Sequence, residues 1–268
     1  IRNAKTRIYI TALYLQNDDA GKEILHALYQ AKQNNPALNV NIFVDANRAQ
    51  RGLIGDPACL GNQEFYRIID EQYEHKIGLY GVLVKTKELF GVLHLKGLMF
   101  DGTVIYTGAS INDVYLHQAD KCRFDRYHII NCQDLADTMI DYLHRYIINP
   151  GFSPLLNTNH RLDKKVQKKY AKKQKLLLKQ SNYSTKVHTD KQGTIKVTPM
   201  VGFGTRGNKL NNCIREIFKH SQKSLILFTP YFNLPHSLAR DVIKALKRGV
   251  KLTIVVGDKT ANDFFIHN

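Results

Sequence analysis

The sequence predicts an α/β fold made of two similar units, each with a mostly parallel sheet flanked by helices. A strand–helix–strand pattern occurs near the start of the chain and again near its end. Strands that alternate with amphipathic helices favour parallel pairing, because each helix serves as the crossover between two strands. We expect the units at residues 1–150 and 197–268, with a linker at residues 151–196.

The two copies of this pattern align element by element. The first has an apolar run at residues 4–15, a helical stretch at 21–34 and the strand "VNIFVDAN", which contains Asp45. The second has residues 221–232, then 237–249, then a strand followed by Asp258. The alignment places Tyr14 opposite Tyr231, each near the end of a strand. The segment that follows the first copy has no counterpart after the second, so we expect the second unit to be incomplete in this chain.

His94 and Lys96 lie in the segment with the most chemical information, "FGVLHLKGLMFDGTVIYTGASIND". Its apolar flanks predict a strand, on which residues two apart project from the same face. A neutral imidazole can attack phosphorus, and a neighbouring ammonium can stabilise the charge that grows on the phosphate oxygens. The pair therefore predicts a site that handles phosphate.

The residues after this pair strengthen that interpretation. Asp101 begins a predicted turn, and residues 104–106 return as a second strand. The return brings small polar groups to the strand end that carries the His–Lys pair: Gly108, Ser110 and Asn112. An isolated HxK pair on a strand is usually incidental, and this added pattern favours function.

Composition excludes some classes of protein. The chain has no run of eighteen apolar residues, and no signal peptide is visible. The four cysteines form no C-x-x-C pair, so we expect reduced thiols in a cytoplasmic protein: Cys59, Cys122, Cys132 and Cys213. The chain begins at Ile1, which suggests a fragment of something longer. A match to GxGxxG at residues 202–207 lacks an acid on the next strand, and we interpret it as a helix entry.

The net charge of +16 is concentrated in the second half of the chain. Residues 161–179 predict a basic amphipathic helix, with an apolar stripe of Leu162, Val166, Tyr170 and Leu177. Lysines fill its other sides: Lys164, Lys165, Lys168, Lys169, Lys172 and Lys173. Such a helix can lie on an anionic membrane, bind nucleic acid or a ribosome, or serve as a solvated linker. Charge alone leaves these alternatives open.

The pattern of His94, Lys96 and Asp101 resembles the HxKxxxxD signature of the phospholipase D superfamily. The run from "FGVLHLKGLMFDG" to "KCRFDRYH" resembles its bacterial phosphatidylserine synthase branch, as do "ITALYLQNDDAGKEIL" and "TPYFNLP". The family usually has Gly-Ser-x-Asn, whereas this chain has Gly-Ala-Ser-Ile-Asn at residues 108–112. Which of Ser110 and Asn112 contacts the phosphate is therefore open.

The resemblance implies a mechanism. Members of the superfamily build one active site from two HxK motifs, in which one His becomes a phosphohistidine and the other protonates the leaving group. His94 would be one of these, Lys96 would hold the phosphate, and no metal or other cofactor is implied. Asp125 fits the acid that fixes the His ring, although a local pair with Arg123 or Arg126 explains it equally well. We expect Asp101 to organise the hairpin more than to touch substrate.

The resemblance also implies substrates, namely CDP-diacylglycerol and L-serine, with release of CMP. The enzyme would work at the inner face of the cell membrane, which suits the basic helix. Tyr14 and Tyr231 would line the mouth of the site, although core packing explains both as well. Alternatives are a phospholipase D, a cardiolipin synthase, a nuclease of the same superfamily, or a non-catalytic membrane or nucleic-acid binding module. The oligomeric state is open.

Overall fold

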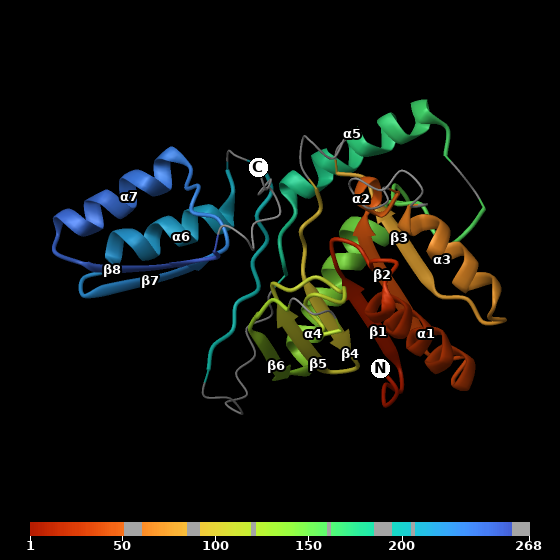
Figure 1. The fold of residues 1–268 in the computed structure, drawn as a ribbon. Helices are drawn as coiled ribbons and strands as arrows, with labels where there is room; N and C mark the ends of the chain where they lie inside the picture. Colours follow the sequence, from red (N-terminus) through yellow and green to blue (C-terminus); the bar gives the residue numbers. More distant parts are fainter. Residues whose placement is uncertain are drawn as a thin grey trace, which may run out of the picture. The chain divides into compact units, whose positions relative to one another are not determined.

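A computed structural model describes residues 1–50, 61–84, 92–118, 122–159, 162–184, 195–204 and 207–258. The chain divides into two compact units, Ile1–Pro199 and Met200–Asn268. Unit 1 contains a six-stranded sheet with the order β3-β2-β1-β4-β5-β6, and unit 2 contains the parallel pair β7-β8 (Figure 1). The α/β class predicted from the sequence is confirmed.

The sheet of unit 1 is parallel in one half and antiparallel in the other. β1 (Arg7–Thr11), β2 (Asn39–Asp45) and β3 (Gly78–Val82) pair in parallel. β4 (Gly97–Phe100), β5 (Thr103–Thr107) and β6 (Tyr127–Asn131) pair antiparallel, and β4 also pairs antiparallel with β1. The expectation of a mostly parallel sheet holds for only half of it, because the two-residue turn between β4 and β5 can join only antiparallel neighbours.

Two helices cover one face of this sheet. α1 (Asp19–Asn34) begins at the N-cap Asp18, whose side chain accepts a hydrogen bond from the Gly21 N–H. α1 and α3 (Asn62–Glu71) bury apolar side chains against alternate residues of β1 and β2. This main core consists of Ile8, Ile10, Leu25, Leu28, Tyr29, Val40, Ile42, Phe65, Tyr66 and Ile69, among others. The short α2 (Ala46–Gln50) follows β2 directly.

The strand residues that point to the other face include a row of stacked aromatic rings. The Tyr9 and Phe43 ring centroids are 6.2 Å apart, and those of Phe43 and Tyr80 are 5.2 Å apart. α4 (Gln133–Leu143) continues into the π-helical segment His144–Ile148. This segment reaches the aromatic face, where the Tyr9 hydroxyl lies 2.8 Å from Nε2 of His144. Successive residues of β1 point to opposite faces of the sheet, so the strand contributes Ile8 and Ile10 to the main core and Tyr9 to the aromatic row.

The basic helix forms as predicted, but it packs with a different face. α5 (Lys164–Gln180) begins at the N-cap Asp163. Its buried residues are Ala171, Gln174 and Leu178, whereas the predicted apolar stripe is only half-buried. Ala171 packs against Ala46 and Leu83. The buried face of α5 thus includes a small residue, Ala171, and a polar one, Gln174. A search for a stripe of large apolar residues finds neither of them.

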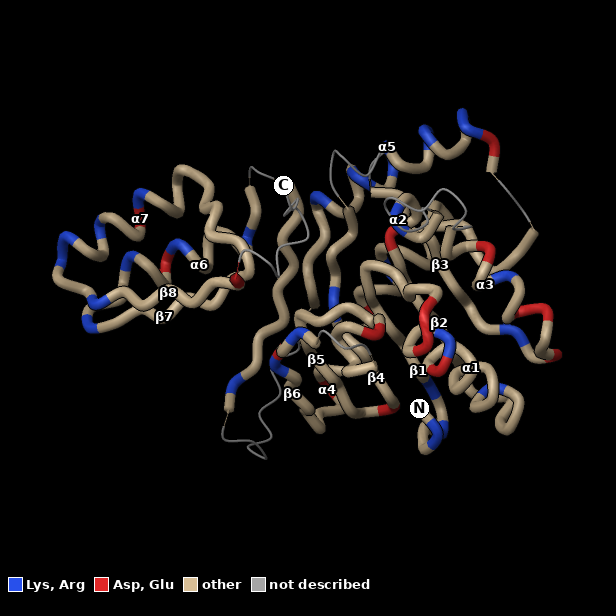
Figure 2. The backbone as a smooth tube through the Cα atoms, viewed as in Figure 1, with Lys and Arg blue, Asp and Glu red and all other residues tan. Residues whose placement is uncertain are grey.

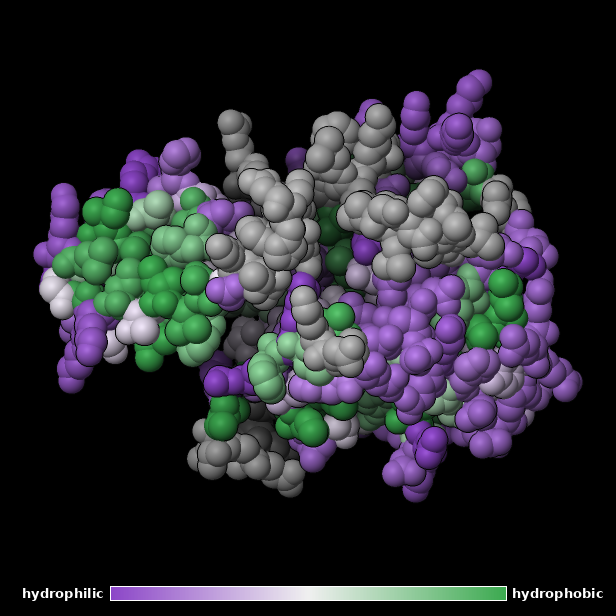
Figure 3. Space-filling model, in the orientation of Figure 1, coloured by the Kyte–Doolittle hydropathy of each residue, from purple (hydrophilic) through white to green (hydrophobic). Residues whose placement is uncertain are grey.

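Unit 2 repeats the β1–α1–β2 pattern, as the sequence predicts. After α6 (Lys209–His220), β7 (Ser224–Thr229), α7 (His236–Lys247) and β8 (Lys251–Val256) form a parallel pair with its crossover helix. The glycine-rich stretch before α6 does lead into a helix, although residues 205–206 lie outside the described part. The core is small: Phe218, Leu225, Leu238, Val242, Ala245 and Val250. Other apolar side chains of its sheet are exposed, among them Ile226 and Phe228. Figure 3 shows apolar residues gathered on the visible face of unit 2.

Candidate functional site

The candidate site lies at one end of the sheet of unit 1. β1 and β5 end there and β4 and β6 begin there, because Thr11 pairs with Gly97 and Thr107 pairs with Tyr127 (Figure 1). β2 also ends there, at Asp45. Antiparallel pairing therefore brings the start of one strand beside the end of the next, so segments distant in sequence meet at this end.

His94 and Lys96 precede β4 instead of lying within it. The strand begins at Gly97, whose φ of 141° is a conformation that residues with a side chain rarely adopt. The prediction that the two side chains share one strand face was wrong. His94 is exposed and Lys96 is buried. The two groups are nonetheless close enough for the Lys96 charge to act on the His94 ring.

Lys96 connects the HxK segment to the Gly/Ser/Asn segment after β5. Its Nζ donates a hydrogen bond of 2.8 Å to the Ala109 carbonyl and a weaker one of 3.4 Å to Oγ of Ser110. Burial lowers the pKa of Lys96 to about 8, although the nearby Asp125 carboxylate acts in the opposite direction. The ammonium is thus desolvated and aimed at the segment that the sequence predicted for phosphate contact.

The surroundings of His94 favour the neutral imidazole. Desolvation lowers the pKa of His94 below its usual value, and repulsion from the Lys96 ammonium lowers it further. A neutral imidazole has a free lone pair, which nucleophilic attack requires. The surroundings of the two side chains thus favour different charge states, a neutral imidazole at His94 and a cationic amine at Lys96.

Asp125 belongs to the site through Lys96 and Gly108. Its charge raises the pKa of Lys96, and its Oδ2 would lie 3.1 Å from a Cβ built on Gly108, which leaves little room for a side chain there. Its Oδ1 accepts a hydrogen bond from the Arg126 N–H at 2.6 Å. The structure describes both Asp125 and His94 and shows no hydrogen bond between them. That Asp125 fixes the orientation of the His94 ring therefore stays a prediction.

Ser110 and Asn112 are placed differently with respect to Lys96. The Ser110 hydroxyl lies beside the Lys96 amine. The Asn112 side-chain oxygen instead accepts a hydrogen bond from the Tyr115 N–H at 3.2 Å, and its carbonyl accepts one from Leu116. Asn112 therefore begins a turn, and Ser110 is the better placed of the two to meet a phosphate oxygen.

A pair of aspartates that the sequence reasoning did not single out fixes this segment. Oδ2 of Asp18 accepts a hydrogen bond from the Asp113 N–H at 2.9 Å, and Oδ1 of Asp113 accepts one from the Ala20 N–H at 2.7 Å. Burial raises the pKa of Asp18, against the effect of its hydrogen bonds. The available signal was an acid before the first helix and another directly after Asn112.

Tyr14 lies at the edge of this region, under an arginine. The Arg48 guanidinium carbon is 4.0 Å from the centre of the Tyr14 ring, a cation–π distance. The next residue, Leu15, forms a bridge with Ile111, the neighbour of Ser110. The sequence reasoning missed Arg48, which shows no motif. Tyr231 follows β7 in unit 2, where its carbonyl accepts a hydrogen bond from Oγ1 of Thr229.

Asp101 lies at the opposite end of β4 from the site. Its carboxylate accepts hydrogen bonds from three backbone N–H groups, those of Lys5, Thr6 and Arg7, and from the Thr6 hydroxyl. Desolvation would raise the pKa of Asp101, but these hydrogen bonds outweigh it and lower the pKa to about 2. Asp101 thus joins the N-terminal segment to the hairpin, as its position in a turn suggested.

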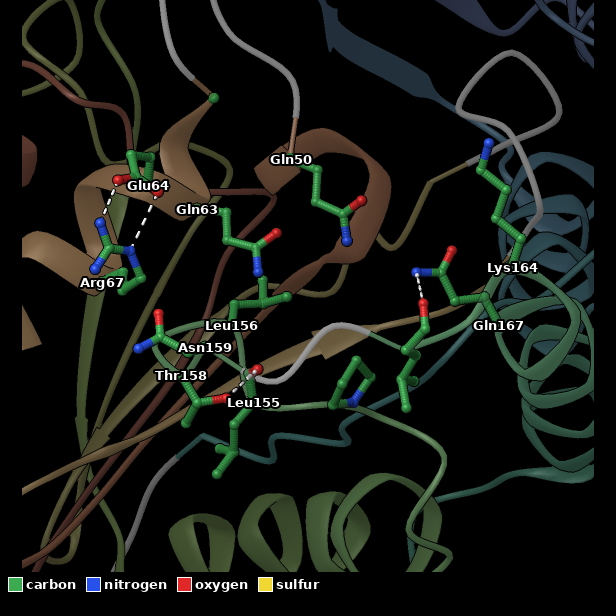
Figure 4. Close-up of a pocket in the computed structure, with 13 residues that line it drawn as sticks. Gln50, Gln63, Glu64, Arg67, Leu155, Leu156, Thr158, Asn159, Lys164 and Gln167 are labelled. Atoms are coloured by element: carbon green, nitrogen blue, oxygen red, sulfur yellow. Dashed lines mark hydrogen bonds and ion pairs between the residues drawn. The ribbon is translucent and has the colours of Figure 1, made fainter.

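A cavity of about 570 Å³ lies elsewhere in unit 1 (Figure 4). Its lining includes carboxamide side chains, the Glu64–Arg67 ion pair and Lys164. None of the groups around His94 lines it. In the described part of the chain, no three His, Cys, Asp or Glu side chains gather in a way that could hold a metal ion.

The six lysines predicted for membrane contact are all exposed: Lys164, Lys165, Lys168, Lys169, Lys172 and Lys173. Figure 2 shows basic positions distributed along α5. The helix lies near the site end of the sheet, because Ala171 packs on Ala46 and Leu83, which follow β2 and β3. Among the described helices, none is both long enough and apolar enough to cross a bilayer.

Known proteins similar to this chain share both its sequence and its fold. A CDP-diacylglycerol–serine O-phosphatidyltransferase from Haemophilus influenzae is 43% identical over 270 residues. One from Escherichia coli is 43% identical over 268 residues. The crystal structure of phosphatidylserine synthase from Haemophilus influenzae has a TM-score of 0.92 at 41% identity. Each comparison covers 99% of this chain and 59% of the relative, so the chain spans about three fifths of their length.

Residues 1–146, which include the whole HxK region, match the family described as "Cardiolipin synthase, PLD-like domain". This match covers more than half of the chain. The chain belongs to this PLD-like family.

Proposed function

We propose that this protein is a phosphatidyltransferase that makes phosphatidylserine from CDP-diacylglycerol and L-serine and releases CMP. The observation that carries the proposal is the position of the Lys96 amine, 2.8 Å from the Ala109 carbonyl and next to Ser110, beside an exposed and neutral His94. The names of the relatives that are 43% identical over 99% of the chain support the choice of donor and acceptor.

The proposed reaction has two steps. A ring nitrogen of His94 attacks the phosphorus that carries diacylglycerol, the N–P bond forms, and the P–O bond to CMP breaks. The serine hydroxyl then attacks the same phosphorus, loses its proton, and displaces the imidazole. Lys96 and Ser110 stabilise the charge on the phosphate oxygens in both steps. The proton transfers fall to a second imidazole, which the resemblance assigns to a second HxK motif that these 268 residues do not contain.

The test uses protein of the full length of its relatives, with CDP-diacylglycerol in mixed micelles, with and without L-serine. We expect CMP release to require serine and to match the phosphatidylserine formed. CMP release that is indifferent to serine would indicate a hydrolase and contradict the proposal. Replacement of His94 by Ala should reduce turnover by about 1,000-fold or more, since the covalent route is lost. His220→Ala, at an exposed position in unit 2, is the matched control.

We also infer that α5 brings the site to an anionic membrane. The helix buries Ala171, Gln174 and Leu178 against unit 1 and leaves its lysines exposed. The contact would therefore be mainly electrostatic, made by the exposed lysines. The position of α5 near the site end of the sheet supports this role over nucleic-acid binding, because the proposed donor is a lipid.

A further inference from the structure

We propose that Asp45, a residue outside the HxK motif, positions the segment that carries His94 and Lys96. Asp45 is completely buried at the end of β2. Its Oδ2 accepts a hydrogen bond of 2.8 Å from the Leu93 N–H, and its Oδ1 accepts one of 2.8 Å from the Arg48 N–H. One carboxyl group thus joins the residue directly before His94 to the first turn of α2.

The HxK segment is held at two points, and His94 lies between them. At one end, Asp45 holds the Leu93 backbone. At the other end, the Lys96 amine binds the Ala109 carbonyl at 2.8 Å. Because β4 begins only at Gly97, ladder hydrogen bonds of the strand do not fix residues 93–96. Asp45 therefore supplies the positional constraint that a strand would otherwise give to the His94 backbone.

Asp45 also connects this segment to the edge of the site. Its own N–H donates to the Leu13 carbonyl at 3.1 Å, directly before Tyr14. The backbone N–H of Arg48 donates a hydrogen bond to Asp45, and the Arg48 guanidinium lies over the Tyr14 ring. Three segments that converge at the site, residues 13–14, 45–48 and 93–96, thus meet at one buried residue, the first through the Asp45 backbone and the other two through its carboxylate. In unit 2, Asp258 occupies a similar place shortly after β8, so the repeat carries an acid at both strand ends.

A neutral amide at this position would leave one of the two backbone N–H donors without its acceptor. In Asp45→Asn, the side chain keeps one acceptor oxygen and gains an NH₂ group, so one of the two backbone N–H donors would face another donor. A buried N–H without an acceptor is unfavourable, so the Leu93 backbone should shift or open. Asp45 does not touch the substrate in this proposal and acts through the His94–Lys96 segment, so it is a positioning residue.

Amide hydrogen exchange tests this in the protein without any assumption about its activity. In Asp45→Asn, we expect the Leu93 amide to exchange about 10-fold faster or more, while the amides of Ile10 and Ile42 in the central strands keep their protection. Asp70→Asn is the matched control, because Asp70 is also buried and accepts hydrogen bonds from Tyr29 and Asn157 in another part of unit 1. Unchanged Leu93 exchange in Asp45→Asn, or equal acceleration in Asp70→Asn, would overturn the proposal.

The effect of Asp45 on turnover rests on the proposed function and is measured separately. A displacement of His94 by about 1 Å should lower kcat by about 100-fold with a much smaller change in KM. Asp70→Asn should leave kcat per folded molecule unchanged. If Asp45→Asn does not fold, replacement of Leu93 by its α-hydroxy acid analogue removes only the N–H donor and should lower kcat in the same way. Normal kcat in that ester variant would contradict the positioning role, whereas an inactive parent protein would contradict only the proposed function.

Discussion

At the scale of single residues, the site depends on a lysine that is easier to deprotonate than usual. Burial lowers the pKa of Lys96 to about 8, from the ordinary value of 10.5. The charged ammonium is therefore present below about pH 8 and is lost as the pH rises through that value. An amine that must stabilise phosphate charge should thus impose an upper pH limit on turnover.

We predict that log kcat/KM falls above about pH 8 and that this limit moves upward in Lys96→Arg. The guanidinium stays protonated throughout this range, so the basic limb should disappear even if the rate at neutral pH drops. Steady-state rates between pH 6 and pH 10 measure this. A basic limb that stays in place in Lys96→Arg would assign the limit to another group.

The sequence predicted which residues meet at the site better than how they are held. The spacing of His94 and Lys96 before a turn, and of Ser110 after it, was enough to predict that they converge, because a hairpin returns the chain to its starting edge. The prediction that His94 and Lys96 share one strand face was wrong, since the strand begins only at Gly97. The contact between Asp45 and Leu93 joins residues 48 apart in sequence, and no local pattern encodes it.

At the scale of elements, Asp101 shows how a motif acid can be structural. It accepts hydrogen bonds from Lys5, Thr6 and Arg7 and so joins the start of β1 to the β4–β5 turn. The pKa of Asp101 is about 2 in the folded protein, against 3.8 ordinarily. Its carboxylate therefore contributes to stability above about pH 4, and this contribution is lost as the pH falls through about 2.

We predict that Asp101→Ala lowers the free energy of unfolding at pH 7 by about 2 kcal/mol, through the lost backbone hydrogen bonds. Turnover per folded molecule should change little, because the residue lies at the far end of β4. Asp101→Asn should keep part of the hydrogen bonding but lose the pH dependence between pH 4 and pH 2. Urea denaturation across this range measures both effects. A large loss of kcat in a fully folded Asp101→Ala protein would indicate that Asp101 takes part in catalysis.

For α5, the helix and its exposed lysines follow from the sequence, but the buried face does not. A stripe of large apolar residues was expected, whereas Ala171 and Gln174 face unit 1. Gln174 is fully buried and donates a hydrogen bond to the Tyr146 carbonyl at 2.7 Å. Hydropathy assigns a glutamine to the surface, so its burial could not be predicted without knowing that the Tyr146 carbonyl accepts from its amide.

We predict that three Lys→Gln changes on α5, at Lys165, Lys168 and Lys172, weaken binding to anionic vesicles. Each lysine near the surface contributes about 1 kcal/mol at low salt, so the loss should reach about 100-fold. The effect should shrink as salt is added, because the contact is electrostatic. Three Lys→Gln changes in unit 2, at Lys244, Lys247 and Lys251, serve as the charge-matched control. Equal losses from both sets would indicate a response to net charge instead of a role for α5.

At the scale of the whole molecule, the two units have separate cores of very different size. The main core of unit 1 joins α1, α3 and the sheet, and the described core of unit 2 is built from six buried residues. A small core stabilises a domain less, because less apolar surface leaves water on folding. Both units share the β–α–β repeat, so we expect their stabilities to differ through the elements that each unit adds to it.

We predict that the chain unfolds in two steps, with unit 2 first. Leu238→Ala should lower the free energy of unfolding of the first step by about 3 kcal/mol and leave the second unchanged, because Leu238 is buried only in the core of unit 2. Leu28→Ala, in the core of unit 1, should affect only the second step. Guanidinium denaturation followed by circular dichroism, with hydrogen exchange to assign each step, measures this. If either substitution shifted both steps together, the units would unfold as one cooperative body, and the separate cores would not be separate thermodynamic domains.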